Sequence, residues 1–299
     1  MADTIVITGS HGLLASGLMP RLASRGHSLL RLVRGRPVGA DQFLWDPLGG
    51  TIDVSPLERA DAVVHLAGEP IPAVRWSRAK MARIYDSRVK GTRLLSETLA
   101  GFSRRPRVLI SASASGYYGD RGEDVLTEES SPGDTFLARV CRDWEAATEP
   151  ARRVGIRVVH LRSGNVLARR RGFLGPQVPL FRLGLGGRLG SGRQYVPWIA
   201  VDDWVSAVEH LLAAEGLMGP VNVVAPEAVK NHEFTATLAR VLRRPAFLPV
   251  PGAALKLVMA ELGVELLRGQ RMRPAVLVES GFTFQYPDLE SALHHVLHP

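Results

Sequence analysis

The sequence has 299 residues, 45% of them hydrophobic and 22% charged, which is the balance of a soluble globular chain with one large or two modest domains. No apolar run is long enough for a membrane helix, no basic-then-apolar leader precedes Thr4, and the single Cys141 excludes an intramolecular disulfide, so we expect a cytoplasmic protein without a membrane partner. The net charge of +8 comes from scattered Lys and Arg residues without interleaved aromatic side chains, which favours a polyanionic small molecule over nucleic acid as the partner.

Short apolar runs alternate with amphipathic segments of helix length through the first half of the chain. The predicted strands cover residues 4–9, 28–34, 61–68, 107–114 and 156–162, and the predicted helices cover residues 12–26, 79–101 and 137–155. Strands that are apolar on both faces and separated by helices form a parallel sheet covered on both sides. Residues 1–163 therefore predict an α/β domain with a doubly wound parallel sheet.

The rhythm changes after Arg162, where residues 164–198 are rich in Gly and Pro. The segments beyond them are a predicted helix at 201–216, a strand at 221–225, a helix at 231–244 capped by Asn231, an amphipathic stretch at 253–269 and a last helix from Pro287. We expect residues 200–225 to return to the first domain. Residues 164–199 and 226–299 should form a smaller α+β part that binds the substrate over the strand ends.

The turn after the first predicted strand follows a G-x-x-G-x-x-A pattern that ends at Ala15. The first glycine allows a tight turn, the second lets a diphosphate approach the backbone, and a small third residue lets the helix pack on the sheet. Free N–H groups and the helix dipole then bind an anion without side-chain charge. The position between a strand and a helix favours a dinucleotide site over a merely structural turn. The cofactor-binding residues expected there are Gly9, Ser10, His11, Gly12, Leu13 and Leu14.

The end of the second predicted strand selects between the two nicotinamide dinucleotides. An acid at this point hydrogen-bonds the adenine ribose 2′-hydroxyl and favours NAD, whereas an arginine fits a 2′-phosphate. This chain has Arg34 and Arg36, with no Asp or Glu before Asp41. We therefore predict NADP(H) as the cofactor, with Arg34 on its 2′-phosphate; a surface arginine at a strand end is the alternative.

The third predicted strand ends in small residues. Leu66, Ala67 and Gly68 follow His65 there, and small side chains at a strand end let the chain pass beside a cofactor. We therefore expect these three residues to belong to the cofactor site, although any strand-to-loop turn uses such residues.

Three motifs, "TGSHGLLA", "HLAG" and "SASASGYYG", together resemble the extended short-chain dehydrogenase/reductase superfamily, in its NAD-dependent epimerase/dehydratase branch with a Rossmann fold. Later stretches such as "LRSGNVL" and "PLFRLGLGGRLGSGRQYVPWIAVDD" are similar to the atypical subgroup of SDR39U-like epimerase family proteins. The resemblance covers essentially the whole chain, including a C-terminal extension from about Leu248. It also allows a homodimer through helices within 80–99 and 138–153.

The resemblance implies a serine, a tyrosine and a lysine as the catalytic residues. In the superfamily the serine orients the substrate oxygen, the tyrosine transfers the proton, and a lysine four residues later lowers the tyrosine pKa. Ser113 matches the serine, but the chain has no Y-x-x-x-K, and Leu137 and Cys141 stand at those two positions.

Several explanations of the missing pair stay open. Tyr117 or Tyr118 lies close enough in sequence to Ser113 to replace the phenol, although a tyrosine in "GYYG" is more often a packed loop aromatic. The positive charge would then come from Lys80, Arg83 or Arg88, and the resemblance places Arg88 among the cofactor-binding residues. Alternatively, the proton comes from solvent, or the protein binds NADP without catalysis.

Further residues follow from the same resemblance. Arg162 and Ser163 should contact the nicotinamide end of the cofactor, and Ser111 should lie beside it at the strand edge. Arg193 and Trp198 belong to a glycine-rich loop that we expect to meet an anionic or planar substrate, with a long surface loop as the alternative.

These patterns predict an NADP(H)-dependent oxidoreductase that acts on a small carbonyl, alcohol or activated double bond. The alternatives are a non-catalytic NADP-binding regulator and a nucleotide-sugar epimerase. No metal is expected, because the nine histidines form no ligand cluster in the sequence.

Overall fold

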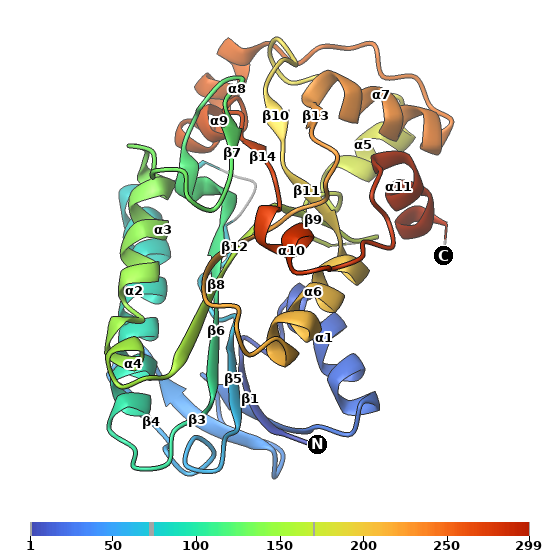
Figure 1. The fold of residues 1–299 in the computed structure, drawn as a ribbon. Helices are drawn as coiled ribbons and strands as arrows, with labels where there is room; N and C mark the ends of the chain where they lie inside the picture. The colour runs from blue at the N-terminus through green and yellow to red at the C-terminus, as the bar shows by residue number, and fades with distance from the viewer. Residues whose placement is uncertain (1, 72–74, 170, 299) are drawn as a thin grey trace.

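An eight-stranded sheet forms the centre of the computed structural model, which describes residues 2–71, 75–169 and 171–298 (Figure 1). In spatial order the strands are β12 (Gly219–Val223), β8 (Arg157–Ser163), β6 (Val108–Ala114), β5 (Ala62–His65), β1 (Thr4–Thr8), β2 (Ser28–Val33), β3 (Gln42–Asp46) and β4 (Thr51–Ile52). All neighbours are parallel except β3 and β4. The predicted doubly wound parallel sheet is confirmed.

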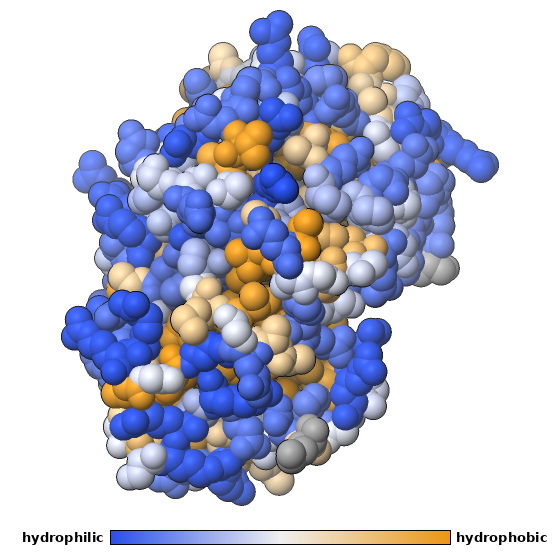
Figure 2. Space-filling model, viewed as in Figure 1, coloured by the Kyte–Doolittle hydropathy of each residue, from blue (hydrophilic) through white to orange (hydrophobic). Residues whose placement is uncertain are grey.

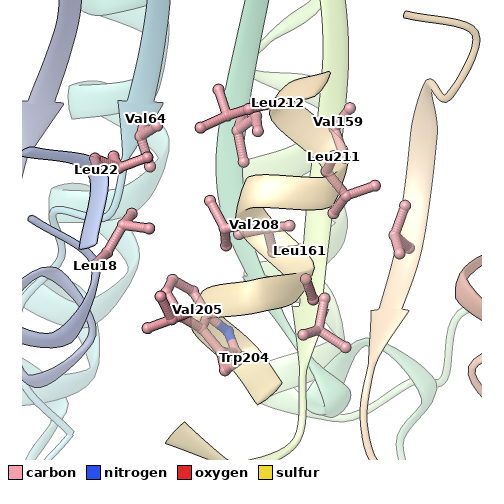
Figure 3. Packing of buried hydrophobic residues seen from close by; sticks show 14 of the residues in the cluster. Leu18, Leu22, Val64, Val159, Leu161, Trp204, Val205, Val208, Leu211 and Leu212 are labelled. Atoms are coloured by element: carbon pink, nitrogen blue, oxygen red, sulfur yellow. The ribbon is translucent and has the colours of Figure 1, made fainter. Parts of the chain in front are cut away.

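Helices cover both faces of this sheet (Figure 1). One face carries α1 (Leu13–Ser24) and α6 (Val201–Ala213), and the other carries α2 (Arg78–Ala100), α3 (Phe136–Ala146) and α4 (Glu149–Arg153). Figure 3 shows side chains of α1, α6 and the strands meeting in one core, among them Leu18 and Trp204, which are fully buried. Each buried side chain of this size contributes roughly 1.5–3 kcal/mol to folding.

A smaller α+β part lies beyond the carboxyl ends of the strands (Figure 1). Its strands are β7 (Val125–Leu126), β9 (Asn165–Leu167), β10 (Tyr195–Val196), β11 (Trp198–Ala200), β13 (Val229–Lys230) and β14 (Arg271–Met272), which form three two-stranded sheets. Its helices are η1 (Ser115–Tyr118), α5 (Gln177–Arg182), α7 (Asn231–Leu242), α8 (Gly252–Met259), α9 (Glu261–Glu265), α10 (Ala275–Glu279) and α11 (Leu289–Leu297). α5, α7 and α11 enclose a second hydrophobic core.

The two parts are connected by the chain and also packed against each other. α10 packs against β12, and Leu277 from this helix enters the core of the large sheet. Figure 2 shows a mainly hydrophilic face with apolar side chains gathered near its middle, around α10. The C-terminal residues therefore support the sheet as well as the smaller part.

The structure corrects three details of the sequence prediction. The helix expected at 137–155 is broken into α3 and α4, because Pro150 has no N–H to continue the ladder, and the Thr148 hydroxyl donates to the Glu145 carbonyl oxygen at 2.7 Å. β3 and β4 were not predicted. Asn231 does not cap α7: it is the first helical residue, and its side-chain oxygen accepts the Leu189 N–H at 2.8 Å.

Candidate functional site

The turn between β1 and α1 brings the backbone against the end of β5. Gly9 has a left-handed φ of +72°, and a Cβ atom on it would lie 2.8 Å from the carbonyl carbon of Leu66. The Gly12 N–H donates to the Gly9 carbonyl oxygen at 2.9 Å, and α1 begins at the next residue. The Ser10 hydroxyl is buried without a hydrogen-bond partner in the described part of the chain. Free N–H groups at the start of α1 and an unpaired buried hydroxyl together fit a diphosphate.

A first cavity of about 240 Å³ lies between this turn and the end of β2. The predicted residues on its wall are Gly9, Ser10, His11, Gly12, Arg34, Leu66, Ala67 and Gly68. Leu13 is not on this wall; it opens α1. The position agrees with the rule that ligands bind beyond the strand ends where the strand order reverses, here on either side of β1.

Charges at the first cavity favour an extra phosphate over a ribose hydroxyl. Arg34 is exposed on the cavity wall. Asp41, the first acid after β2, does not line the cavity, and its carboxylate accepts the Arg31 Nε–H at 2.5 Å. This hydrogen bond holds the pKa of Asp41 below its ordinary value. The wall therefore presents a guanidinium where a carboxylate would be needed to bind the 2′-hydroxyl of NAD.

A second cavity of about 380 Å³ begins where the first ends, since Leu66 lines both. Its near wall comes from the carboxyl ends of the strands and from α3, and its far wall comes from the smaller part. Besides Leu66, four predicted residues lie on it: Leu14, Arg88, Ser113 and Ser163.

Ser113 is held by a buried ion pair. Its hydroxyl donates to Oε1 of Glu145 at 2.7 Å. Arg162 donates to both oxygens of the same carboxylate, each at 2.9 Å, and the two side chains are 4% and 10% exposed. Arg162 also donates to the Tyr118 hydroxyl oxygen at 3.0 Å, and its guanidinium lies 3.4 Å from the centre of the Tyr117 ring. The predicted Arg162 thus lies behind the cavity wall and fixes Glu145 in place.

The structure corrects the role expected of the two tyrosines. Neither lines a cavity, and Tyr118 is fully buried, with its hydroxyl donating to Oδ1 of Asn222 at 2.7 Å. Burial raises the pKa of Tyr118 to about 12. Tyr117 packs on Tyr118 and on Arg162. Tyr118 therefore belongs to the buried network, and Tyr117 packs beside it, off the walls of both cavities.

Three other predicted residues also lie away from both cavities. Ser111 is wholly buried inside β6. Trp198 is 1% exposed in the second core, because β11 turns it inward, and Val196 and Pro197 face the cavity instead. Arg193 is exposed and lines neither cavity.

The two family positions without their usual residues lie on the second cavity. Leu137 and Cys141 form part of its wall, and burial raises the pKa of the Cys141 thiol to about 12. Of the three cations considered for the missing lysine, only Arg88 is on this wall; Lys80 donates to Glu69 at 2.6 Å, and Arg83 lies 3.6 Å from the same carboxylate. The second cavity is thus apolar where the superfamily has its acid and its lysine.

Sequence reasoning missed most of the far wall of the second cavity. Its polar members are Asn165, Gln194, Tyr195, Asn231, Glu265, Arg268 and Gln270. Gln194 and Tyr195 adjoin the predicted Arg193, so the glycine-rich loop was the right segment. The residues of α9 and its flank carry no local pattern that marks them as cavity residues.

Within residues 2–71, 75–169 and 171–298, no group of three or more His, Cys, Asp or Glu side chains is arranged to hold a metal ion. Across the same ranges, no helix combines the length and the apolar character needed to cross a bilayer.

Comparison with known proteins covers nearly the whole chain. The model of the NAD dependent epimerase/dehydratase family matches residues 5–224, and a domain of unknown function (DUF1731) matches residues 250–296. Epimerase family protein Mb2239 of Mycobacterium bovis is 42% identical over 98% of this chain and 97% of its own length.

Two crystal structures agree with the fold. That of human epimerase family protein SDR39U1 with NADPH has a TM-score of 0.88 at 32% identity, over 98% of this chain and 99% of that one. That of a nucleoside-diphosphate sugar epimerase from Corynebacterium glutamicum has a TM-score of 0.82 at 37% identity, over 99% of this chain and 58% of that one. The chain therefore belongs to the NAD dependent epimerase/dehydratase family.

Proposed function

We propose that the chain binds NADP(H) along the two cavities and transfers a hydride to or from a small alcohol, carbonyl or activated double bond. The observation that carries this proposal is that Leu66 lines both cavities, so a dinucleotide on the glycine turn would reach past it into the cavity that holds Ser113. The human relative crystallised with NADPH supports the same cofactor here. When bound, the nicotinamide supplies or accepts the hydride.

The chain's own residues have separate tasks in this proposal. Backbone N–H groups of the turn at Gly9 and Gly12 bind the diphosphate. Arg34 binds the 2′-phosphate, because its guanidinium is exposed on the first cavity and Asp41 is occupied by Arg31. Ser113 positions the substrate oxygen.

The second cavity favours a compact and largely apolar substrate. Most of its wall is aliphatic or aromatic. Of its described residues two are cations: Arg88 donates through Nη1 to two backbone carbonyl oxygens, and Arg268 pairs with Glu265. The diphosphate of a nucleotide sugar is best bound by several cations, so this mainly apolar wall supports epimerisation of such sugars less well. Residues 164–199 and 226–299 supply most of the far wall in this proposal.

A non-catalytic NADP(H) sensor is the second candidate. The observation that favours it is the apolar pair Leu137 and Cys141 on the cavity wall, at the positions of the usual tyrosine and lysine. A sensor needs the cofactor site and a second ligand or partner, but no proton transfer.

Thermal unfolding with NADPH, NADH or no nucleotide tests the cofactor assignment. A ligand at a thousand times its dissociation constant adds about 4 kcal/mol of stability, so NADPH should raise the melting temperature more than NADH at equal concentration. Arg34→Asp should reverse this order, because a charge-assisted hydrogen bond to the phosphate is worth roughly 1.5–3 kcal/mol, or about ten- to a hundredfold in affinity. Arg36→Asp makes the same charge change off the cavity and should keep the order. Equal shifts by both nucleotides would remove the argument from Arg34.

A panel of alcohols, ketones, aldehydes and enones separates the enzyme from the sensor. The enzyme should change the absorbance of the reduced nicotinamide with at least one compound, and Ser113→Ala should slow that reaction. Tight NADPH binding with no turnover across the panel would favour the sensor.

A further inference from the structure

The hydrogen of the Ser113 hydroxyl points away from the second cavity. The side chain lies on the cavity wall and is 5% exposed, and its oxygen is 2.7 Å from Oε1 of Glu145. A carboxylate accepts hydrogen bonds and does not donate them, so at this distance the serine must be the donor. A hydroxyl has one hydrogen, and Ser113 therefore has none left for a ligand.

Glu145 keeps accepting this hydrogen bond, because Arg162 holds its carboxylate in place. The guanidinium donates to both carboxylate oxygens, which is the bidentate geometry that holds a carboxylate in one orientation. Arg162 is itself held by the Tyr118 hydroxyl, by the Glu128 carbonyl oxygen and by the face of the Tyr117 ring. The direction of the serine hydroxyl is thus set by a buried network.

The lone pairs of Ser113 are the part of its hydroxyl that is left for the cavity. No donor among residues 2–71, 75–169 and 171–298 forms a hydrogen bond to this oxygen. Three other neutral side chains on the wall donate elsewhere: Asn165 to the Pro197 carbonyl oxygen, Gln194 to two carbonyl oxygens and Tyr195 to Glu123. Ser113 therefore offers this cavity an acceptor and no donor.

We propose that Glu145 is a positioning residue that makes Ser113 a hydrogen-bond acceptor, so that the cavity selects a ligand with a hydroxyl group over the matching ketone or aldehyde. This inference rests on the proposed function for the identity of the second cavity as the substrate site, and it narrows the substrate class to alcohols. A carbonyl oxygen at the same place would face the serine lone pairs and gain no hydrogen bond from them.

Matched ligand pairs test the proposal without turnover. Ligand-observed NMR on the nucleotide-free protein measures the affinities of cyclohexanol against cyclohexanone and of benzyl alcohol against benzaldehyde. Each alcohol should bind about five- to tenfold tighter than its partner, which is the effect of one net hydrogen bond. Ser113→Ala should bring the ratio close to one. Ser115→Ala, a serine on the same wall without a bond to Glu145, should keep the wild-type ratio.

A second variant separates the effect of the Ser113 hydroxyl's orientation from the effect of having a serine at this position. Glu145→Asp keeps the charge for Arg162 but withdraws the carboxylate from Ser113, so the hydroxyl can turn toward the cavity and the alcohol preference should fall. If Glu145→Asp does not unfold cooperatively, the proposal is tested by the ratio of alcohol to carbonyl affinity in Ser113→Ala alone. Equal binding of each pair, tighter binding of the carbonyl compounds, no binding of either alcohol, or an unchanged ratio in Ser113→Ala would overturn the proposal. If the alcohols bind more tightly but NADPH does not raise the melting temperature, this proposal is supported and the proposed function is contradicted.

Discussion

The two cavities are built in different ways, although they share a wall. The first is formed by one short turn after β1, by the ends of β2, β3 and β5 and by Ser87 of α2, and its main features are backbone features: the left-handed Gly9 and the N–H groups at the start of α1. The second is formed by side chains from segments between Leu14 and Gln270, and Ser113 on its wall is held by a buried network.

This difference explains how the same fold can keep one ligand and change another. A backbone-built dinucleotide site tolerates many side-chain changes, because its donors are the same in every sequence. A side-chain-built cavity changes its chemistry with a few substitutions, as Leu137 and Cys141 show. The two regions should therefore respond differently to mutation, and the predictions below test that contrast.

The largest expected effect is on the network behind the second cavity. Glu145→Ala removes the partner of a buried guanidinium, and breaking a buried pair in this way costs about 3–5 kcal/mol of folding free energy because the remaining charge is left uncompensated. Urea unfolding followed by circular dichroism measures the loss. Glu149→Ala breaks another Glu–Arg pair only a few residues along the chain, but one in which the arginines are 68% and 76% exposed, and it should change stability little. Similar losses in both variants would show that the network is not a special support of the cavity.

The next effect concerns the backbone of the first cavity. Gly9→Val forces a β-branched residue into a left-handed conformation and against the Leu66 carbonyl, so we expect a loss of about 1–3 kcal/mol from strain alone and no thermal shift with NADPH. Gly26→Val introduces a similar strain at φ +87°, with open space around the new Cβ and far from the cofactor site. Gly26→Val should lose stability but keep the NADPH shift. A preserved shift in Gly9→Val would contradict the role of the turn.

The sequence predicts the first region well because its signals are local. The strand, the glycine turn and the helix follow one another between residues 4 and 24, and Arg34 directly follows the next strand. The parallel sheet follows from apolar runs separated by helices, although β3 is a short five-residue strand at the outer side of the sheet and its alternating pattern was overlooked.

The second region depends on contacts that no local pattern encodes. Glu145 lies on α3 and Arg162 on β8, and only the sheet order brings both to Ser113 on β6. The same limit misled the interpretation of Tyr118, which is close to Ser113 in sequence but turns inward to Asn222. Sequence proximity thus could not show that Ser113 lies on the cavity wall while Tyr118 is buried away from it.

A buried histidine links the two regions. The Thr8 hydroxyl oxygen accepts the N–H groups of Leu66 and Ala67, each at 3.1 Å, so its one hydrogen donates to Nδ1 of His65 at 2.8 Å. The partners therefore assign the hydrogen of His65 to Nε2, which donates to the Thr92 hydroxyl oxygen at 2.9 Å. The same Thr92 oxygen accepts the indole N–H of Trp144, a residue of the second cavity.

This chain of contacts has no place for a second proton on His65, and burial lowers its pKa to about 4. The unfolded chain takes up that proton near pH 6.5 while the folded protein does not, so the histidine's contribution is complete above pH 6.5 and is lost as the pH falls toward 4. At pH 5 the loss is roughly 2 kcal/mol, at about 1.4 kcal/mol per pH unit, and His160, whose pKa is also lowered by burial, adds to it with the same sign.

Urea unfolding of wild type and His65→Gln between pH 7 and 4.5 measures this effect. The free energy of unfolding should fall less steeply with decreasing pH in the variant, and the difference in slope should be up to about 1.4 kcal/mol per pH unit, the value for one proton. The dependence of this free energy on urea concentration should be the same in both proteins. The NADPH shift should weaken in wild type over the same pH range, because a proton on Nδ1 breaks the Thr8 contact that holds Leu66 and Ala67 against Gly9. Parallel slopes in the two proteins would mean that His65 is solvated in the native state, and the link between the two cavities would then have no physical basis.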